Sequence, residues 1–382
     1  MSDTDNTMSP ERALDLVTRV FLREWSLLKM DGITVMKLSG GYSNTIWLIS
    51  RKACNNNSTS DEPHQVIIRV SGGNLMRDSN QGFSPTTEKE EIIITNGASN
   101  YGCAPKLYCL CGNSMVVEYI ETIKLTPILA LEPNIAREIA TSLARFHSID
   151  LPLNKRGFNV LKKTKEFIEK VPISQLKSYW NEIKDSIKDK INNFQDIEVF
   201  LDWNIIEELE WALLVKDKIK SRIVMSHGDS NFLNLLVRKT EVEGKLQVLL
   251  CDFEFSCYCE RAFDIGGHFS NYIFQWNEEN KLTGHAIPKM DQRREFLIYY
   301  LQETKKLNYI HDFDDAGRDS IENVMQEADY GIILYYLYIL GLFRRSFDTY
   351  IKPHPTFGNL FKIMTDDYKK LKHEFIEKYL KI

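Results

Sequence analysis

The feature that most constrains this fold is a change of hydrophobic pattern along the chain. From about residue 32 to 121, short apolar runs alternate with glycine and polar turns, which is typical of antiparallel strands. From about residue 131, apolar residues recur at helical spacing, with Ile135, Ile139 and Leu143 on one face. The pattern predicts a bilobal α+β protein, with an antiparallel β lobe at residues 1–121 and a larger, mostly helical lobe at residues 122–382.

Individual elements can be placed within these lobes. The expected strands are Ile33–Leu38, Thr45–Ile49, Val66–Val70, Met115–Tyr119, Leu235–Val237 and Val248–Leu250. One helix is expected at Thr87–Ala98 and two at Leu161–Phe194, while the polar run Ala53–His64 indicates a flexible hairpin loop. The strands after residue 230 predict a hairpin embedded in the helical lobe.

Charge and composition exclude several classes of function. A net charge of -5 supplies no basic field for nucleic acid. The odd count of 7 cysteines in a chain of 382 residues favours reduced thiols, and the two Cys-x-Cys pairs are shorter than the usual zinc spacing. The polar N-terminus shows no signal peptide, and the apolar run Gly331–Phe343 is too short to span a membrane. We therefore expect a cytoplasmic protein without a membrane span.

The strongest chemical signal is a pair of spaced motifs. The stretch Ser226–Asn234 reads SHGDSNFLN, and Leu250–Glu254 reads LCDFE. Phosphoryl transfer needs one carboxylate to accept the proton of the attacking hydroxyl, and oxygen ligands to hold magnesium against the triphosphate. Asp229 fits the first role, and Asn234 and Asp252 fit the second. Turn residues that cap a hairpin are the alternative for one motif alone, but the spaced pair favours a phosphotransferase.

Two weaker signals lie in the first lobe. Gly40, Gly41, Ser43 and Asn44 form a turn whose backbone N–H groups could approach phosphate, although a plain hairpin turn has the same composition. Arg69 is flanked by aliphatic residues in the run VIIRV and needs a partner, either Glu90 or Glu91 of the next helix or the phosphates of a nucleotide. An edge-strand arginine that reaches water is the alternative.

Together these motifs resemble the choline/ethanolamine kinase family, a branch of the protein-kinase-like fold that also includes aminoglycoside phosphotransferases. The family's His-x-Asp-x₄-Asn stretch is matched by His227, Asp229 and Asn234. Its following motif is matched by Asp252–Phe255 and by Arg261–Phe269, which reads RAFDIGGHF. The resemblance also covers Ala104–Tyr108, Val117–Ile120 and Phe146-His147, and it extends from about residue 38 to 361.

The resemblance implies the cofactors ATP and Mg²⁺ and a role for each matched residue. It implies that Asp229 is the catalytic base, that Asn234 and Asp252 bind magnesium, and that Glu254 assists a second metal ion. It further implies that Gly40, Gly41, Ser43, Asn44 and Arg69 contact phosphates, and that the hinge residues Glu118 and Ile120 meet adenine. Asp264 and His268 are expected to be mainly structural and to support the catalytic loop, and we favour the simpler interpretation that they are ordinary buried hydrogen-bonding residues. The family also includes homodimers that pair through the first lobe.

The acceptor pocket is where this chain departs from the family. A quaternary ammonium such as that of choline is bound by aromatic faces. By the resemblance, Trp276, Tyr335, Tyr338 and Phe361 line this pocket, together with Asn271, where the family usually has glutamate. Aromatic residues at helical spacing more often only fill a core.

The expected activity is therefore phosphorylation of a small amino alcohol, choline or ethanolamine, for phospholipid synthesis. A methylated ethanolamine, another amino alcohol or an aminoglycoside-like acceptor stay open. A catalytically weak, pseudokinase-type binding protein stays open as well.

Overall fold

The computed structural model describes residues 8–38, 44–52, 62–71, 84–190, 194–273, 286–308, 313–352 and 358–380. The chain forms two compact units, one of Met1–Lys124 with Leu236–Glu254 and the other of Leu125–Leu235 with Phe255–Ile382. The segment Leu236–Glu254, which we expected within the second lobe, packs in the first unit. It does so because Val237 pairs with Ile123 and because Leu250 N–H donates to the Cys103 carbonyl at 2.8 Å. The assignment of domains 1–121 and 122–382 stays a prediction.

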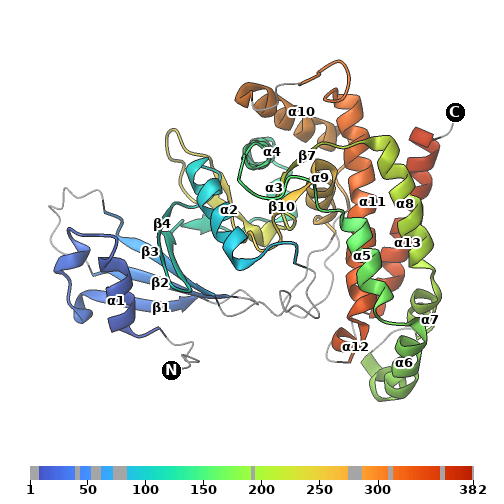
Figure 1. Cartoon of the computed structure of the whole chain (residues 1–382), viewed down its shortest axis with the longest axis horizontal. Coiled ribbons are helices and arrows are strands. Elements are labelled where there is room, and N and C mark those ends of the chain that lie inside the picture. The colour runs from blue at the N-terminus through green and yellow to red at the C-terminus, as the bar shows by residue number, and fades with distance from the viewer. Residues whose placement is uncertain are drawn as a thin grey trace. The chain divides into compact units, whose positions relative to one another are not determined.

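The first unit is built on a five-stranded antiparallel sheet with strand order β1-β2-β3-β5-β4 (Figure 1). Its strands are β1 (Ile33–Leu38), β2 (Asn44–Arg51), β3 (Gln65–Ser71), β4 (Leu107–Cys111) and β5 (Ser114–Glu118). The four strands expected from the sequence are all present, and only β4 was not expected. The register places Arg69 opposite Ile46 on one side and Met115 on the other, so this arginine lies on the central strand and not at an edge.

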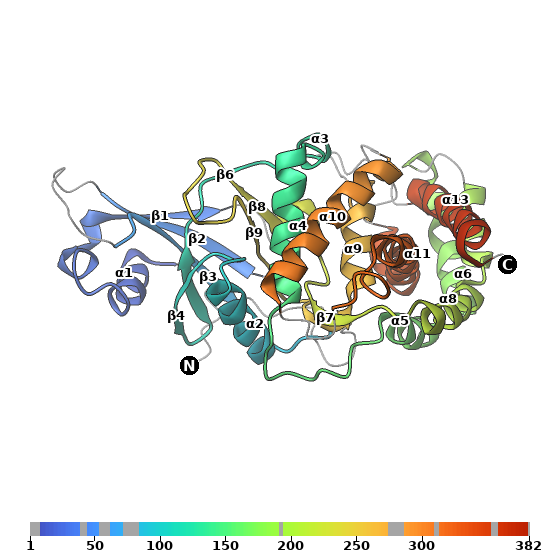
Figure 2. The same cartoon turned by 90° about the horizontal axis from the view of Figure 1, so that it is seen from above.

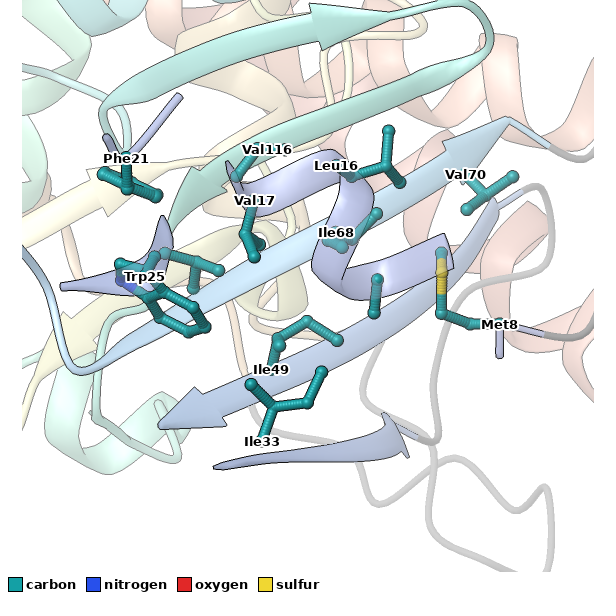
Figure 3. Close-up of a cluster of buried hydrophobic side chains, with 12 residues drawn as sticks. Met8, Leu16, Val17, Phe21, Trp25, Ile33, Ile49, Ile68, Val70 and Val116 are labelled. Atoms are coloured by element: carbon teal, nitrogen blue, oxygen red, sulfur yellow. The ribbon is translucent and has the colours of Figure 1, made fainter. Parts of the chain in front are cut away.

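Helix α1 (Pro10–Thr18) covers one face of this sheet. Figure 3 shows Leu16 and Val17 of the helix against Ile49 and Ile68 of the strands. The alternation of buried and half-buried residues along β3 directs Val66, Ile68 and Val70 into this core. Arg69 therefore points to the opposite face of the sheet.

The remaining elements of the first unit are a helix and a small sheet. Helix α2 (Glu88–Asn100) packs beside β4, and a capping box between Thr87 and Glu90 begins it (Figure 1). The strands β6 (Thr122–Ile123), β8 (Leu235–Arg238) and β9 (Val248–Leu250) form a three-stranded sheet of order β6-β8-β9. The embedded hairpin predicted after residue 230 corresponds to β8 and β9.

The second unit is mainly helical. Its longer helices are α4 (Pro133–His147), α5 (Val160–Glu169), α6 (Ile173–Ile187), α7 (Phe194–Asp202), α8 (Ile205–Ile219), α9 (Arg261–Ser270), α10 (Met290–Leu307), α11 (Ile321–Arg345) and α13 (Gly358–Phe375). Two one-turn helices, α3 (Pro127–Ala130) and α12 (Phe347–Tyr350), and several shorter helical turns complete it. Figure 2 looks along α11 and shows it between α9 on one side and α8 and α13 on the other. None of the described helices is both long and apolar enough to cross a bilayer.

A short antiparallel ribbon in this unit joins β7 (Ile223–Ser226) to β10 (Cys257–Glu260), with Ser226 opposite Cys257. The sequence analysis did not predict β10, because four residues of mixed polarity carry no clear alternation. The ribbon matters for function because the His-x-Asp motif begins directly after β7.

Helices α9 and α11 cross in backbone contact at two glycines. A Cβ atom added to Gly266 would lie 1.9 Å from the Gly331 carbonyl carbon, and one added to Gly331 would lie 1.8 Å from the Ala262 carbonyl oxygen. No side chain fits at either position, so both residues must be glycine for this crossing to form. The close approach explains Gly266 in the RAFDIGGHF stretch, while a Cβ atom at Gly267 would lie 2.9 Å from the Tyr335 ring.

Substitution of Gly331 by alanine should therefore destabilise the protein. We expect Gly331→Ala to lower the free energy of unfolding by at least about 2 kcal/mol, because the helices must separate to admit the methyl group. Urea denaturation followed by circular dichroism measures the change. Gly32→Ala is the matched control, since its Cβ would meet the Leu28 side chain, with the terminal Cδ2 nearest at 3.2 Å, and no backbone atom. Equal stability of the two variants would contradict the backbone contact.

Candidate active site

In the first unit, Arg69 lies among carboxylates. Its guanidinium forms ion pairs with Glu91 at 2.7 Å and with Asp252 at 3.0 Å. Of the two glutamates proposed as partners, Glu91 is thus the one that binds, while Glu90 belongs to the capping box of α2. Burial alone lowers the pKa of Arg69, but the carboxylates of Glu91, Asp252 and Glu254 outweigh it and leave the pKa raised. The arginine stays a cation on the face of the sheet opposite the α1 core.

Asn44 contacts the same arginine from the neighbouring strand. In the orientation that satisfies both groups, its side-chain oxygen accepts from Arg69 at 2.5 Å and 3.2 Å. Asn44 follows directly after Gly40, Gly41 and Ser43, which lie outside the described residues. The phosphate-binding role of this turn stays a prediction, but its last residue does lie beside Arg69.

Asp252 follows β9 in an unusual backbone conformation. Its φ angle is +68°, in the left-handed region that a non-glycine residue seldom adopts. One carboxylate oxygen accepts from Arg69, while the side chain remains 39% exposed. Strain of this kind persists where the surroundings fix it and is concentrated at functional sites. The geometry leaves a partly solvated carboxylate just after the strand, and Glu254 follows two residues later.

In the second unit, the predicted catalytic loop (residues 227–234) leaves β7 through Gly228. The φ angle of Gly228 is +81°, and a Cβ atom there would lie 2.3 Å from the Phe255 carbonyl oxygen. Glycine is therefore required both for its backbone angle and for the close approach of the neighbouring chain. The loop ends in a 3₁₀ turn at Phe232–Asn234.

The buried carboxylate of Asp264 on α9 binds the start of this loop. It accepts the backbone N–H of His227 at 2.5 Å and that of Gly228 at 2.7 Å. Its Oδ2 also lies 3.0 Å from His147 Nε2, and the other ring nitrogen of His147 lies 2.8 Å from the Tyr300 hydroxyl. Asp264 thus positions the residues just before Asp229, which agrees with the supporting role predicted for it.

The protonation states within this network follow from burial. Burial lowers the pKa of His147, so the ring is neutral near pH 7. We assign its single proton to Nε2, facing the carboxylate, while Nδ1 accepts from Tyr300. Burial alone raises the pKa of Asp264, but its hydrogen bonds to His147 and to the loop outweigh burial and hold the pKa below the usual value. The carboxylate therefore remains an acceptor for the loop amides.

Two amide side chains surround the carboxylate of Asp229. Asn231 Nδ2 lies 2.9 Å from both carboxylate oxygens, and Asn234 Nδ2 lies 3.1 Å from Oδ2 and 2.9 Å from the Asp229 backbone carbonyl. The Asn231 oxygen accepts from the Leu233 N–H at 2.8 Å, which fixes the orientation of that amide. Asp229 is therefore held as an ordered acceptor, which is what its predicted role as general base requires.

Each unit carries one oxygen donor of the kind that magnesium prefers. Asn234 uses Nδ2 toward Asp229, which leaves Oδ1 as its ligating atom, and Asp252 offers a carboxylate oxygen besides the one that meets Arg69. Mg²⁺ is typically held by one or two protein oxygens together with phosphate and water. Within the described parts of the chain, no group of three or more His, Cys, Asp and Glu side chains is arranged to hold a metal ion by itself.

The expected acceptor residues separate into two groups. Tyr335 and Tyr338 on α11 contact each other at 5.9 Å between ring centroids, and both contact Phe263 of α9. Asn271, directly after α9, is buried, and its Nδ2 donates to the Gly267 carbonyl at 2.9 Å. Burial, with the nearby Asp229 carboxylate, raises the pKa of both tyrosines. These residues therefore lie close to the predicted base.

Phe361 and the hinge residues Glu118 and Ile120 do not belong to this group. The ring of Phe361 stacks on Phe200 at 4.3 Å and contacts Phe343 and Phe347, so it belongs to a second aromatic cluster. Trp276 lies outside the described residues. Glu118 ends β5, and its side chain accepts from the Lys106 N–H at 3.1 Å, while Ile120 is buried. The roles of Phe361 in the acceptor pocket and of the hinge in adenine binding stay predictions.

The sequence analysis missed three residues. Asn231 was inside the quoted motif, and an amide two residues after the base was a usable signal. Phe263 was inside the RAFDIGGHF stretch, but its packing depends on the glycine crossing. Tyr300 had no signal, since its contact with His147 arises only from the packing of α10 on α4.

Comparison with known sequences decides the family. The sequence model of the choline/ethanolamine kinase family matches residues 35–338, which is most of the chain. The chain belongs to this family. A human choline/ethanolamine kinase is 25% identical over 289 residues, which cover 74% of this chain and 66% of the human protein. A probable ethanolamine kinase of Arabidopsis thaliana is 28% identical over 322 residues, covering 83% and 74% of the two chains. The match thus spans just under two thirds of the human relative.

Solved structures show the fold of this choline/ethanolamine kinase family member. The choline kinase of Cryptosporidium parvum superposes with a TM-score of 0.69 at 16% identity and covers 97% of both chains. A spectinomycin phosphotransferase superposes with a TM-score of 0.50 at 11% identity, covering 92% of this chain and 93% of its own. The likeness confirms the predicted α+β, protein-kinase-like fold.

A buried histidine of the family motif gives a prediction about pH. His268 is 1% exposed, stacks on Phe296 at 5.0 Å, and has its pKa lowered to about 4 by burial. The unfolded chain has a histidine pKa near 6.5, so the folded state disfavours the proton. Neutral His268 therefore makes its full contribution to the unfolding free energy above about pH 6.5, and this contribution is lost as the pH falls toward 4.

We expect His268→Phe to remove this dependence while it keeps the ring stack. Between pH 7 and 4, the wild type should lose about 3 kcal/mol more unfolding free energy than the variant, at 1.36 kcal/mol for each unit of pKa shift. Urea denaturation at several pH values measures both proteins, and the carboxylates common to both cancel in the difference. If the unfolding free energies of the two proteins changed with pH in parallel, the pKa of His268 would not be lowered in the folded state.

Proposed function

We propose that this protein is an ATP- and Mg²⁺-dependent kinase that phosphorylates the hydroxyl of choline, ethanolamine or a closely related amino alcohol. The observation that carries the proposal is the ordered carboxylate of Asp229, which accepts from Asn231 and Asn234 in a loop whose start is bound by Asp264. Family membership supports the same reaction and the same class of acceptor. The products would be phosphocholine or phosphoethanolamine, which serve phospholipid synthesis.

The chain's own residues divide the work of the reaction. Asp229 accepts the proton of the substrate hydroxyl while the hydroxyl oxygen attacks the γ-phosphorus of ATP. The side-chain amides of Asn231 and Asn234 keep the Asp229 carboxylate in one orientation. Asn234 Oδ1 and Asp252 would hold Mg²⁺, with Glu254 near a second ion. When bound, the metal offsets charge on the β- and γ-phosphates. The phosphates would be bound by Arg69, Asn44 and the turn with Gly40, Gly41 and Ser43. Adenine would be bound by the chain near Glu118 and Ile120.

The setting of the enzyme forms a further part of the proposal. We expect it to act in the cytoplasm on a small-molecule acceptor without a nucleic-acid partner. We also expect that it can pair with a second copy through the first unit. Size-exclusion chromatography with light scattering tests the pairing directly, since a monomer at micromolar concentration would overturn it.

Two variants separate catalysis from metal binding. Asp229→Asn should lower kcat by 10²-fold or more, because an amide cannot accept the proton, while MgATP binding stays within about threefold of the wild type. Asp252→Ala should instead weaken MgATP binding at least tenfold, because a metal ligand is lost. A coupled ADP-release assay and isothermal titration calorimetry measure these effects.

Asp366→Asn is the matched control, since this exposed carboxylate forms an ion pair with Lys362 one turn away on α13, and it should change neither quantity. If Asp229→Asn kept a tenth of the wild-type rate, Asp229 would not be the base. A wild-type protein that bound MgATP but turned over no amino alcohol would instead favour a pseudokinase-type binding protein.

A further inference from the structure

Two cysteines of the first unit, which the proposed function does not use, lie side by side on one strand. Cys109 and Cys111 belong to β4, and their sulfur atoms lie 3.3 Å apart. Both are free thiols and both are only half-buried, which leaves them open to small molecules. We infer that this pair is a site of reversible oxidation, at which a small-molecule disulfide such as oxidised glutathione converts the two thiols into one intrachain disulfide.

The geometry of the strand brings the two sulfurs together. Side chains of residues i and i+2 lie on the same face of a strand, and both cysteines pack at the border of the core that α1 covers. A disulfide bond is about 2.0 Å long, so the sulfurs need to approach each other by only about 1.3 Å. Along an extended strand the two Cα atoms lie about 6.6 Å apart, near the upper limit of about 6.8 Å for a disulfide. The bond can thus form, but under strain, and strained disulfides are readily reduced again.

The position of β4 allows the strand to adjust as the bond forms. It comes last in the sheet order β1-β2-β3-β5-β4, so it lies at the edge of the described sheet. Its register on β5 shifts between Leu107 and Cys109, where Tyr108 is one extra residue. The hairpin turn follows Cys111 directly, at Gly112 with φ of +60°. An edge strand between a bulge and a turn can shorten slightly without disturbing the central strands.

A positive charge lies beside the pair. Arg19 is the C-cap residue of α1, and the pKa of its guanidinium is raised first by Asp15 and further by Cys111. Burial and the neighbouring Cys111 raise the pKa of Cys109, while the charge of Arg19 acts in the opposite direction. Thiolates are the nucleophiles of thiol–disulfide exchange, and a nearby arginine stabilises them. The guanidinium therefore favours the step that begins the reaction.

The reaction needs no reagent besides the oxidant. One thiolate of the pair attacks a sulfur of oxidised glutathione and expels one glutathione thiolate, which leaves a mixed disulfide. The second cysteine loses its proton to solvent, attacks the protein sulfur of the mixed disulfide and expels the other glutathione thiolate. Two electrons pass from the protein pair to the oxidant, so one disulfide forms while another is lost. Excess reduced glutathione drives the same steps backwards.

A second Cys-x-Cys pair has the same spacing but a different environment. Cys257 and Cys259 lie on β10, which pairs with β7 inside the second unit. Cys259 is 2% exposed, its thiol donates to the Phe158 carbonyl at 3.3 Å, and burial raises its pKa well above the usual value. If spacing alone decided reactivity, the two pairs would react alike. Their environments predict instead that the β4 pair is oxidised and the β10 pair is not.

Mass spectrometry of the intact wild-type protein tests this difference. The folded protein is incubated with oxidised glutathione near neutral pH, denatured in the presence of an alkylating agent and digested with trypsin. Cleavage after Lys106 and Lys124 releases one peptide that contains both cysteines of β4 and no other cysteine. We expect the β4 pair to become linked at least tenfold faster than the β10 pair, and the link to disappear in excess reduced glutathione. Thiols of β4 that stay free, equal linkage of the two pairs, or a link that reduced glutathione cannot remove would each overturn the inference.

A variant of α1 tests the part played by the positive charge. Arg19→Gln should slow formation of the link about threefold near neutral pH, because the thiolate loses its nearby cation. Arg12→Gln is the matched control, since it removes the same charge from the same helix about two turns away, and it should leave the rate unchanged. Equal rates in Arg19→Gln and the wild type would contradict the assignment of Arg19 as the activating charge.

Single cysteine variants separate the two chemical steps. Cys109→Ser and Cys111→Ser each keep one thiol of the pair, so a mixed disulfide can form but cannot be resolved. We expect at least one of the two variants to retain glutathione on its remaining β4 cysteine, which the same tryptic peptide reports. Circular dichroism verifies that both variants are folded. If neither folded variant retained glutathione there, exchange would not begin at this pair and the inference would fail.

Discussion

The hydrogen bonds between Asp264 and the backbone of His227 and Gly228 are the interaction on which the site depends. The loop leaves β7 and turns at a glycine with φ of +81°, and buried backbone amides at such a turn need acceptors from elsewhere. One buried carboxylate supplies acceptors for two consecutive amides, and His147 and Tyr300 fix that carboxylate in turn. Asp229 is the next residue in the chain, so its position depends on the Asp264 side chain of α9.

Asp264 can serve in this way only because its helix is itself fixed. The first residue of α9, Arg261, is fully buried and donates to Glu327 of α11 and to Asp319, each at 2.7 Å. Arg222, just before β7, forms a further buried ion pair with Asp319. With the glycine crossing one turn later, these charges connect the start of α9 to α11 and to the strand that leads into the loop. Loss of one partner from such a buried network costs several kcal/mol, because a charge is left uncompensated.

Much of this architecture could be predicted from the sequence. The strands of the first unit follow from short β-branched runs between turns, and the two motifs follow from residue types that phosphoryl transfer requires. Tertiary packing accounts for what could not be predicted. Val237 joins the first unit through pairing with Ile123, and Phe361 joins Phe200 instead of Tyr335. Helical spacing indicates which residues share a face, but not which neighbouring helix that face meets.

Amide hydrogen exchange in an Asp264→Asn variant tests the central claim most directly. Asparagine keeps the shape but replaces one acceptor oxygen with a donor that faces a loop N–H. We predict that residues 227–231 lose protection at least tenfold, while β3 and α13 exchange as in the wild type. If His227 and Gly228 kept their full protection in the folded variant, Asp264 would not position the catalytic loop.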